Sequence, residues 1–355
     1  MEAARGSAPG ELPVLPIDDP GIRRHYLLAL PDGVTADEVD VLAVSRFPGT
    51  TWQVPPRSAG PGTTARPSPG VLRLSRHTTL TGPYGLRPGD ALSLGLPATT
   101  AAVFDVTTPR ERGERPYPGG DRDGLKRVFP DGMPVREEER VVLWLVSTAR
   151  RLRASIRTGD AGVVLTPDPD AIIDLTVFSD VWLEPDEALR IVQRAVPRAR
   201  LALDGVDWQG PAPLPDELRP PVDVLGDEER ARLHAEADAY DMAALSAPDQ
   251  VDGYAIVADL VMDGFVALEV GDEDTLPPIL RGLPWTEHGA VAYRVRWTPP
   301  DPDELELEKP SHAHRIARGR AARRVNALAK ALQSAVGGEI ADADDFLVDA
   351  GDLEV

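Results

Sequence analysis

The chain has 355 residues, a formal net charge of −20 and no cysteine. Without cysteine, the chain cannot form disulfides, zinc–thiolate sites, iron–sulfur clusters or a cysteine nucleophile. The negative charge repels nucleic acids and anionic membranes unless a local basic patch overrides it. The acidic N-terminus is unlike a signal peptide, and no apolar run approaches the ~18 residues of a membrane span. We therefore expect a soluble, cytoplasmic globular protein.

The first 108 residues combine short strand-like runs with turn-forming stretches. Residues 1–20 are expected to form a flexible tail, and residues 21–108 a β-rich region whose topology does not follow from the sequence. The strand candidates are His25–Leu30, Val39–Phe47, Thr51–Val54, Val71–Leu74, Ala91–Leu96 and Ala101–Val106. The second of these is also compatible with a short helix, because Thr35 or Asp37 can cap one. Residues 109–135 then form a long connection rich in Arg, Gly and Pro.

A broad apolar stripe follows Arg136. At 100° per residue one narrow sector holds Val141, Leu145, Ala149, Leu152 and Ile156. Trp144 widens this sector, and the acidic residues 137–139 lie where a helix N-terminus favours negative charge. The pattern predicts a helix from Arg136 through Ile156 that is buried against a sheet, with Trp144 in the core.

The strands and helices predicted after this helix follow the order of a common α+β module. The strand-like runs Val163–Thr166 and Ile172–Ser179 are predicted to form a hairpin across the intervening Pro-Asp-Pro-Asp turn. A helix from Glu184 to Ala195 and a strand at Arg200–Leu203 follow. With the strand at Ala101–Val106 in front, the order is βαββαβ, as in a ferredoxin-like module. Residues 136–225, with a first strand from about residue 101, are assigned to this module.

Residues 226–336 are expected to form a second α+β module. It would contain a helix at Asp227–Leu245, strands at Tyr254–Leu260 and Phe265–Val270, a short helix at Asp272–Leu283, a strand at Val291–Trp297 and a basic helix at Ser311–Val336. The Asp263-Gly264 pair predicts a tight hairpin turn with a positive φ at Gly264. Residues 337–355 are an acidic tail that can add a short strand at Phe346–Val348.

The spacing of these elements favours an internal duplication. Gly162 and Gly253 are 91 residues apart, and Ile172 and Phe265 are 93 residues apart. The alternative is one larger α+β domain in which similar elements recur. The predicted fold class is α+β: a β-rich N-terminal region, then one or two ferredoxin-like βαββαβ modules and a C-terminal helix.

Most signatures of enzymatic chemistry are absent. The chain contains no GxxxxGK, GxGxxG, HExxH or GxSxG motif and no EF-hand loop, so the sequence predicts neither a cofactor nor a metal centre. The weak catalytic candidates are the carboxylates of Asp168, Asp170 and Asp174, which could bind a cation or hold one raised pKa. Ordinary turn chemistry is the preferred explanation, because Asp side chains often bond their own backbone.

Two groups of basic residues are candidates for binding an anion or a partner. Beside the central helix these are Arg150, Arg153 and Arg157. In the C-terminal helix they are Arg320, Arg323, Arg324 and Lys330, within a stretch from Lys309 to Lys330 that has seven basic residues and no acidic one. Such a helix can bind nucleic acid, a membrane or an acidic partner, or be neutralised by acids of its own chain. The absence of aromatic residues along it disfavours nucleic acid and membranes.

Three functional interpretations stay open. The first is a non-enzymatic binding or regulatory module whose partner is an acidic protein or a second copy of the chain. The second is an enzyme with a pocket between the α+β modules that is lined by carboxylates and arginines. The third is a nucleic-acid-associated regulator that uses the helix at residues 311–336.

Overall fold

The computed structural model describes residues 11–58, 66–159, 162–202, 226, 229, 231–236 and 253–355. The first ten residues of the predicted tail and most of the predicted helix Asp227–Leu245 lie outside this part of the chain. Within it, the protein has mixed α/β structure with two antiparallel sheets and a long C-terminal helix.

The first sheet is built from residues 26–165. Its order is β2-β3-β4-β5-β1-β6-β7, with strands β1 (Tyr26–Pro31), β2 (Thr51–Val54), β3 (Gly70–Arg73), β4 (Thr79–Tyr84), β5 (Thr100–Thr107), β6 (Ser155–Arg157) and β7 (Val164–Leu165). The helices of this half are α1 (Pro20–Arg24), α2 (Ala36–Arg46), α3 (Asp90–Ser93), α4 (Leu125–Val128) and α5 (Arg136–Arg151).

The second sheet follows from residue 175. Its order is β14-β13-β8-β12-β11-β10-β9, with strands β8 (Leu175–Ser179), β9 (Arg200–Leu201), β10 (Gly253–Asp259), β11 (Phe265–Glu273), β12 (Ala290–Thr298), β13 (Glu339–Asp342) and β14 (Leu347–Val348). Its main helices are α6 (Pro185–Ala195) and α8 (His312–Val336). The short 3₁₀ segments are η2 (Val261–Asp263), η3 (Pro278–Leu280), η4 (Pro284–Thr286), η5 (Pro302–Glu306) and η6 (Ala350–Asp352).

Both halves follow the same path through space. Each begins with a strand and a helix, continues through four strands, crosses over by a long helix and ends in a two-stranded hairpin. The strand order matches as well: β5 and β6 flank β1 as β12 and β13 flank β8. These flanking strands run parallel to each other, and parallel strands need a crossover, which α5 and α8 provide.

The ferredoxin-like topology predicted from the sequence is not confirmed. The expected hairpin between Val163–Thr166 and Ile172–Ser179 is wrong, because β7 pairs with β6 whereas β8 pairs with β12 and β13. The intervening Asp168 carboxylate accepts a hydrogen bond from the Asp170 N–H, at 3.0 Å. This turn carries the chain from one sheet to the other. The predicted repeat also has the wrong boundaries. The two halves of the structure correspond when β1 is matched with β8, and not when Ile172 is matched with Phe265.

Several local predictions in the first half also change. The segment Val39–Phe47 is helical, as the alternative interpretation allowed, and a capping box between Thr35 and Glu38 starts α2. Residues Ala91–Leu96, predicted as a strand, include the short helix α3. Strand β4, with the sequence TLTGPY, was not predicted, because Gly and Pro are depleted in strands.

The central helix ends earlier than its apolar stripe predicts. Arg153 has a φ of 52°, and the N–H groups of Arg153 and Ala154 bond the carbonyls of Arg150 and Ala149. This is a Schellman motif, a helix end that glycine usually provides. The sequence has arginine there, so the end was not visible, and Ile156 lies in β6 instead of the helix.

The hairpin between β10 and β11 is confirmed, and Gly264 has a φ of 83°. The tight Asp-Gly turn is not found, because the last strand pair is Asp259 with Phe265 and the 3₁₀ segment η2 lies in the connection. A Cβ on Gly264 would lie 2.1 Å from the carbonyl oxygen of Thr298. The position therefore requires glycine for two reasons: there is no room for a side chain, and the φ angle is positive.

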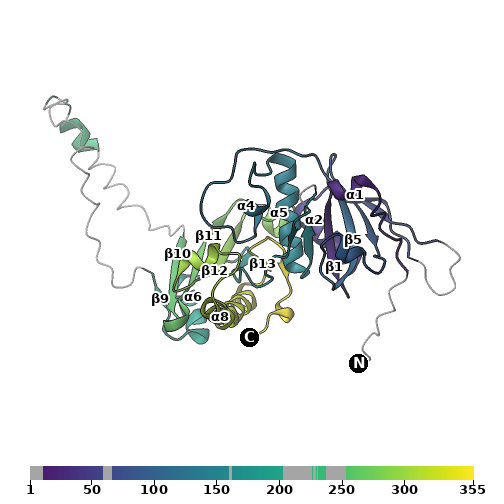
Figure 1. Cartoon of the computed structure of the whole chain (residues 1–355). Coiled ribbons are helices and arrows are strands. Elements are labelled where there is room, and N and C mark those ends of the chain that lie inside the picture. The colour runs from purple at the N-terminus through teal and green to yellow at the C-terminus, as the bar shows by residue number, and fades with distance from the viewer. Residues whose placement is uncertain are drawn as a thin grey trace.

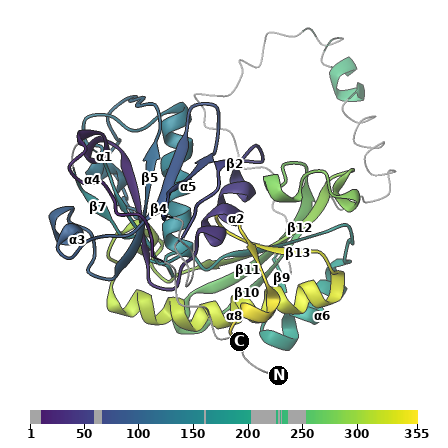
Figure 2. The same cartoon turned by 90° about the vertical axis from the view of Figure 1, so that its right-hand side faces the viewer.

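The elements are arranged in alternating layers. Helices α2 and α5 pack on one face of the first sheet, and α6 and α8 pack on one face of the second. Figures 1 and 2 show α2 and α5 between the two sheets, with α8 on the far side of the second sheet. The face of the second sheet that points toward α2 is covered by η3, which contacts α2.

Trp144 is a central contact of the first core, as predicted. Its side chain is fully buried, its indole N–H donates to the carbonyl of Leu42 at 3.0 Å, and its ring meets Phe47 edge-on at 5.8 Å. The indole thus joins α5 to α2 by a hydrogen bond and by aromatic packing.

We expect Trp144→Ala to lower the free energy of unfolding by ~3–5 kcal/mol, because the substitution removes a buried ring and leaves a cavity. Leu143→Ala in the same helix is the matched control, since Leu143 is half-exposed and should cost less than ~1 kcal/mol. Urea denaturation measures both values. Equal losses for the two variants would show that the ring does not organise the core.

Candidate functional site

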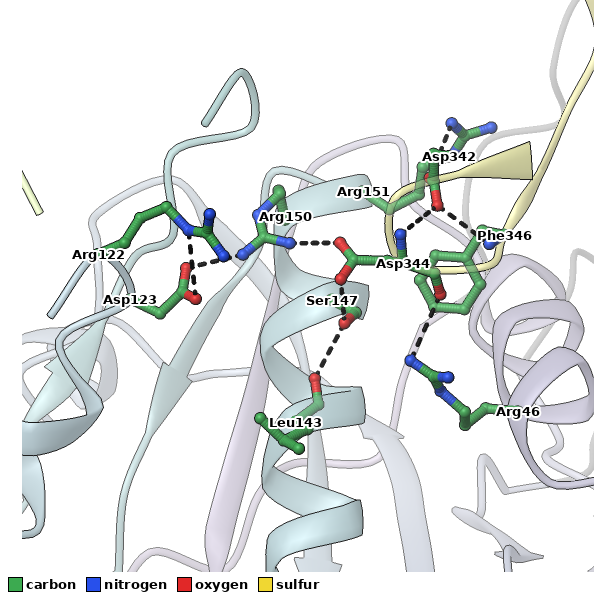
Figure 3. Close-up of polar contacts among 10 residues, drawn as sticks. All are labelled: Arg46, Arg122, Asp123, Leu143, Ser147, Arg150, Arg151, Asp342, Asp344 and Phe346. Atoms are coloured by element: carbon green, nitrogen blue, oxygen red, sulfur yellow. Dashed lines mark hydrogen bonds and ion pairs between the residues drawn. The ribbon is translucent and has the colours of Figure 1, made fainter. Parts of the chain in front are cut away.

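A turn of the second half reaches into the first half. It connects β13 to β14, and its Phe346 ring is buried in the core formed by α2, α5 and the first sheet. Asp344 accepts a hydrogen bond from Ser147 at 2.8 Å (Figure 3). Arg46 forms an ion pair of 3.1 Å with Asp345. We call residues 342–346 the junction turn. It is the contact through which the last hairpin of the chain joins the two cores.

Arg150 is the buried charge at this junction. Only 6% of its side chain is exposed, and its guanidinium pairs with Asp123 at 2.7 Å and also with Asp344. Burial alone would lower the pKa of Arg150, but the two carboxylates raise it. Figure 3 shows the guanidinium between the two carboxylates. This arginine is therefore neutralised by its own protein.

Some of the predicted site residues meet in a cavity beside the junction turn. The cavity has a volume of about 290 Å³, and its charged lining residues include Arg150, Arg153, Asp170, Asp174, Asp342 and Asp344. Asp174 accepts the backbone N–H of Trp297 at 2.9 Å, and burial raises its pKa. The lining holds three arginines and four carboxylates, and the partners of Arg150 and Asp174 are protein groups. The cavity therefore fits a structural polar cluster.

The other sequence candidates lie elsewhere. Asp168 forms an ion pair of 2.7 Å with Arg318. Burial raises the pKa of Asp168, but the hydrogen bonds from Arg318 and from the Asp170 N–H outweigh it and hold this pKa below its usual value. Arg157 is buried in the first sheet, and Lys330 donates to the carbonyl of Leu353 at 3.1 Å. Asp168, Asp170 and Asp174 thus do not converge on one point, and among the described residues no cluster of His, Asp or Glu suits a metal ion.

A larger cavity brings together three predicted basic residues. It lies where the C-terminal end of α6, the end of β10 and the middle of α8 meet, with a volume of about 730 Å³. Its lining includes Arg198, Arg320, Arg323, Arg324, Asp259 and Asp263. We call this cavity the basic groove. Helix α6 packs beside α8 here, and Arg324 donates to the carbonyl of Ala195 at 3.3 Å.

The positive charge in the basic groove is only partly neutralised. Arg320 forms an ion pair of 3.3 Å with Asp263, but its side chain is 64% exposed. Within the described part of the chain, neither Arg198 nor Arg323 makes an ion pair, and Arg324 bonds only a carbonyl oxygen. The groove thus gathers four arginines in a chain whose net charge is −20. They create a local positive field toward which acidic groups are attracted.

An apolar rim accompanies this charge. At the tip of the β10–β11 hairpin, Val261 and Met262 are 63% and 78% exposed, and Phe265 is half-exposed. Val261, which lines the groove, has a φ of 64°. A β-branched residue at positive φ is strained, and such strain is concentrated at functional positions. Exposed apolar side chains beside charged ones are typical of a partner-binding surface.

Comparisons with protein-family models, with curated proteins and with solved structures found no match to this chain. No helix among the described residues has the length and apolar character to cross a bilayer.

Sequence reasoning found part of this site and missed the rest. The basic stretch of the C-terminal helix identified three residues of the groove, Arg320, Arg323 and Arg324. Lys330 of the same stretch lies outside the groove and donates to the carbonyl of Leu353. Arg198 and Val261 were missed, because they belong to elements distant in the chain. The Asp263-Gly264 signal marked the hairpin correctly but did not reveal that its tip faces α8, a packing contact that only the fold shows.

The junction turn should make stability depend on pH through Asp342. Burial raises the pKa of Asp342 from 3.8 to about 6, and the nearby charge of Asp344 adds to this, while backbone N–H groups and Arg151 oppose it. The folded protein thus binds this proton more tightly than the unfolded chain does. Consequently the contribution of Asp342 to stability is greatest at low pH and is lost as the pH rises from about 4 to above 6.

We therefore expect Asp342→Asn to raise the free energy of unfolding at pH 7.5 by on the order of 1–3 kcal/mol, with little change at pH 4. The asparagine oxygen can still accept the N–H groups of Asp344 and Phe346, which bond the same carboxylate oxygen. Thermal unfolding across this pH range is the measurement. Asp352→Asn removes an exposed charge from the same segment and should show no such pH dependence. Equal behaviour of the two variants would contradict the buried-carboxylate argument.

Proposed function

We propose that the protein acts by binding, and that the basic groove takes an acidic segment of a protein partner that also presents apolar side chains. The observation that carries this proposal is the joint occurrence of unpaired arginines and the exposed apolar hairpin tip around one cavity of about 730 Å³. Acidic groups of the partner would neutralise Arg323, Arg324 and Arg198. Its apolar groups would cover Val261 and Met262.

Charge alone would suit nucleic acid as well, but the rest of the helix disfavours it. Arg318 is buried against Asp168, Arg320 pairs with Asp263, and Lys330 bonds a backbone carbonyl. The basic residues therefore do not form a continuous exposed row that could follow a phosphate backbone. The apolar tip has no counterpart in a phosphate backbone, whereas an acidic peptide with leucine side chains matches both features.

The test is fluorescence anisotropy with a labelled peptide of alternating glutamate and leucine, and a lysine–leucine peptide as the charge-reversed probe. We expect the wild type to bind the acidic peptide and to ignore the basic one. Arg323→Glu should weaken binding about tenfold or more, because it places a like charge in the groove. Arg315→Glu is the matched control, since Arg315 is exposed on the same helix but does not line the groove.

A second variant separates the apolar contribution. Met262→Ser should weaken binding without changing its dependence on salt, because it removes contact area and no charge. Equal affinity of Arg323→Glu and Arg315→Glu would refute the groove. Binding of duplex DNA with a steep salt dependence, lost in Arg323→Glu, would instead support the nucleic-acid interpretation.

A further inference from the structure

A second cavity lies at one end of the first sheet, away from the basic groove. Its volume is about 450 Å³, and it opens where β1 begins and β5 ends. Its polar lining residues include Arg24, His25, Thr107, Thr108 and Arg110. None of these residues was a candidate in the sequence, because they come from segments about eighty positions apart.

His25 is held in one orientation within this cavity. Its Nδ1 lies 2.9 and 3.1 Å from the two carboxylate oxygens of Asp105, and the Thr107 hydroxyl lies 3.4 Å from the same nitrogen. Asp105 is buried, so this carboxylate is fixed by its surroundings. A neutral imidazole with Nδ1–H donated to a carboxylate carries its lone pair on Nε2. His25 therefore has one nitrogen fixed by the protein and the other able to accept a proton.

The lining of this cavity includes two arginines, Arg24 and Arg110. Arg157, with 8% of its surface exposed, donates to the carbonyl oxygens of Leu94 and Arg23 at 3.2 and 3.3 Å. Among the described residues it has no carboxylate partner, and burial, together with the charge of Arg23, lowers its pKa. Arg157 lies outside the lining of the cavity, whereas Arg24 is exposed within it. An anion bound in the cavity would offset the charge of Arg24.

The backbone brings these charges to the cavity. A Cβ on Gly159 would lie 2.0 Å from the carbonyl oxygen of Arg24 and 2.5 Å from Nη2 of Arg110. The absence of a side chain at Gly159 thus allows the segment after β6 to pack against the start of β1. Arg110 also donates to the Arg24 carbonyl, which joins the two cationic segments. Two acids lie near this cavity: Asp105 binds His25, and the charge of Asp19 acts on Asp105.

We propose that this cavity binds a small molecule through an anionic oxygen, a phosphate or a carboxylate, beside Arg24 and Arg110, with Nε2 of His25 as the group that exchanges a proton with the bound molecule. The inference is independent of the basic groove, which lies in the other half of the protein. Asp105 is a positioning residue in this arrangement, because it acts only through the imidazole.

Long-range ¹H–¹⁵N spectra of protein labelled at histidine test the proposal, with His25→Gln assigning the His25 signals. Inorganic phosphate and acetate are added separately, which distinguishes a phosphate from a carboxylate ligand. We expect a saturable shift of the His25 Nε2 signal with at least one of the two anions. Arg24→Ala, which keeps the backbone carbonyl, should weaken that binding about tenfold. Arg87→Ala, at an exposed arginine beyond β4, should leave it unchanged.

Asp105→Asn tests the positioning role separately. If Asp105 fixes the tautomer, this variant should change the Nδ1–H fraction of His25 before any anion is added. An unchanged tautomer would remove Asp105 from the proposal. The absence of a His25 shift with both anions, or equal affinity of Arg24→Ala and wild type, would overturn the site itself. Because Arg24 is exposed, Arg24→Ala should fold, so its affinity for the anions tests the site even if Asp105→Asn does not fold.

Discussion

The packing of Phe346 into the core of the first half is the contact on which the arrangement of the two sheets depends. The ring lies among residues of α2, α5 and the first sheet, although it belongs to the last hairpin of the second. Asp344, two residues before it, neutralises Arg150 together with Asp123. Breaking a buried ion pair by removing one partner typically costs about 3–5 kcal/mol. The junction turn therefore combines apolar burial with a charge that cannot be left unpaired, and the two halves form one cooperative structure.

The arginines of this chain differ in whether a carboxylate of the same chain neutralises them. Acidic residues outnumber basic ones by far, so most cations near the core find a carboxylate: Arg150 at the junction and Arg318 beside Asp168 are examples. Other arginines have no ion pair among the described residues, and the two proposals use such arginines: Arg323 on the basic groove and Arg24 in the lining of the His25 cavity. At both positions a bound anion would supply a counter-charge.

Local patterns predicted local structure well, and long-range pairing poorly. The apolar stripe identified α5 and Trp144, the Ser311 cap located the start of α8, and Asp263-Gly264 marked a hairpin. The early end of α5 was invisible because Arg153 has the left-handed conformation that glycine usually adopts. The strand order failed for a different reason: β1 inserts between β5 and β6, a choice that depends on packing across more than a hundred residues. The basic side of the groove could be predicted, since it lies on one helix. The His25 cavity could not, since its lining joins the end of α1 and the start of β1 to the end of β5, about eighty positions further along the chain.

The long separation in sequence between Phe346 and the first sheet has a consequence for synthesis on the ribosome. Domains of a growing chain usually fold as they emerge, N-terminal part first. Here the first half can form its sheet early, but the site that Phe346 occupies stays open until the hairpin of β13 and β14 has been translated. From the synthesis of β7 until that of Phe346, a nascent chain thus exposes an apolar recess in its first half. The core of the first half depends for completion on a ring from the hairpin of the second half.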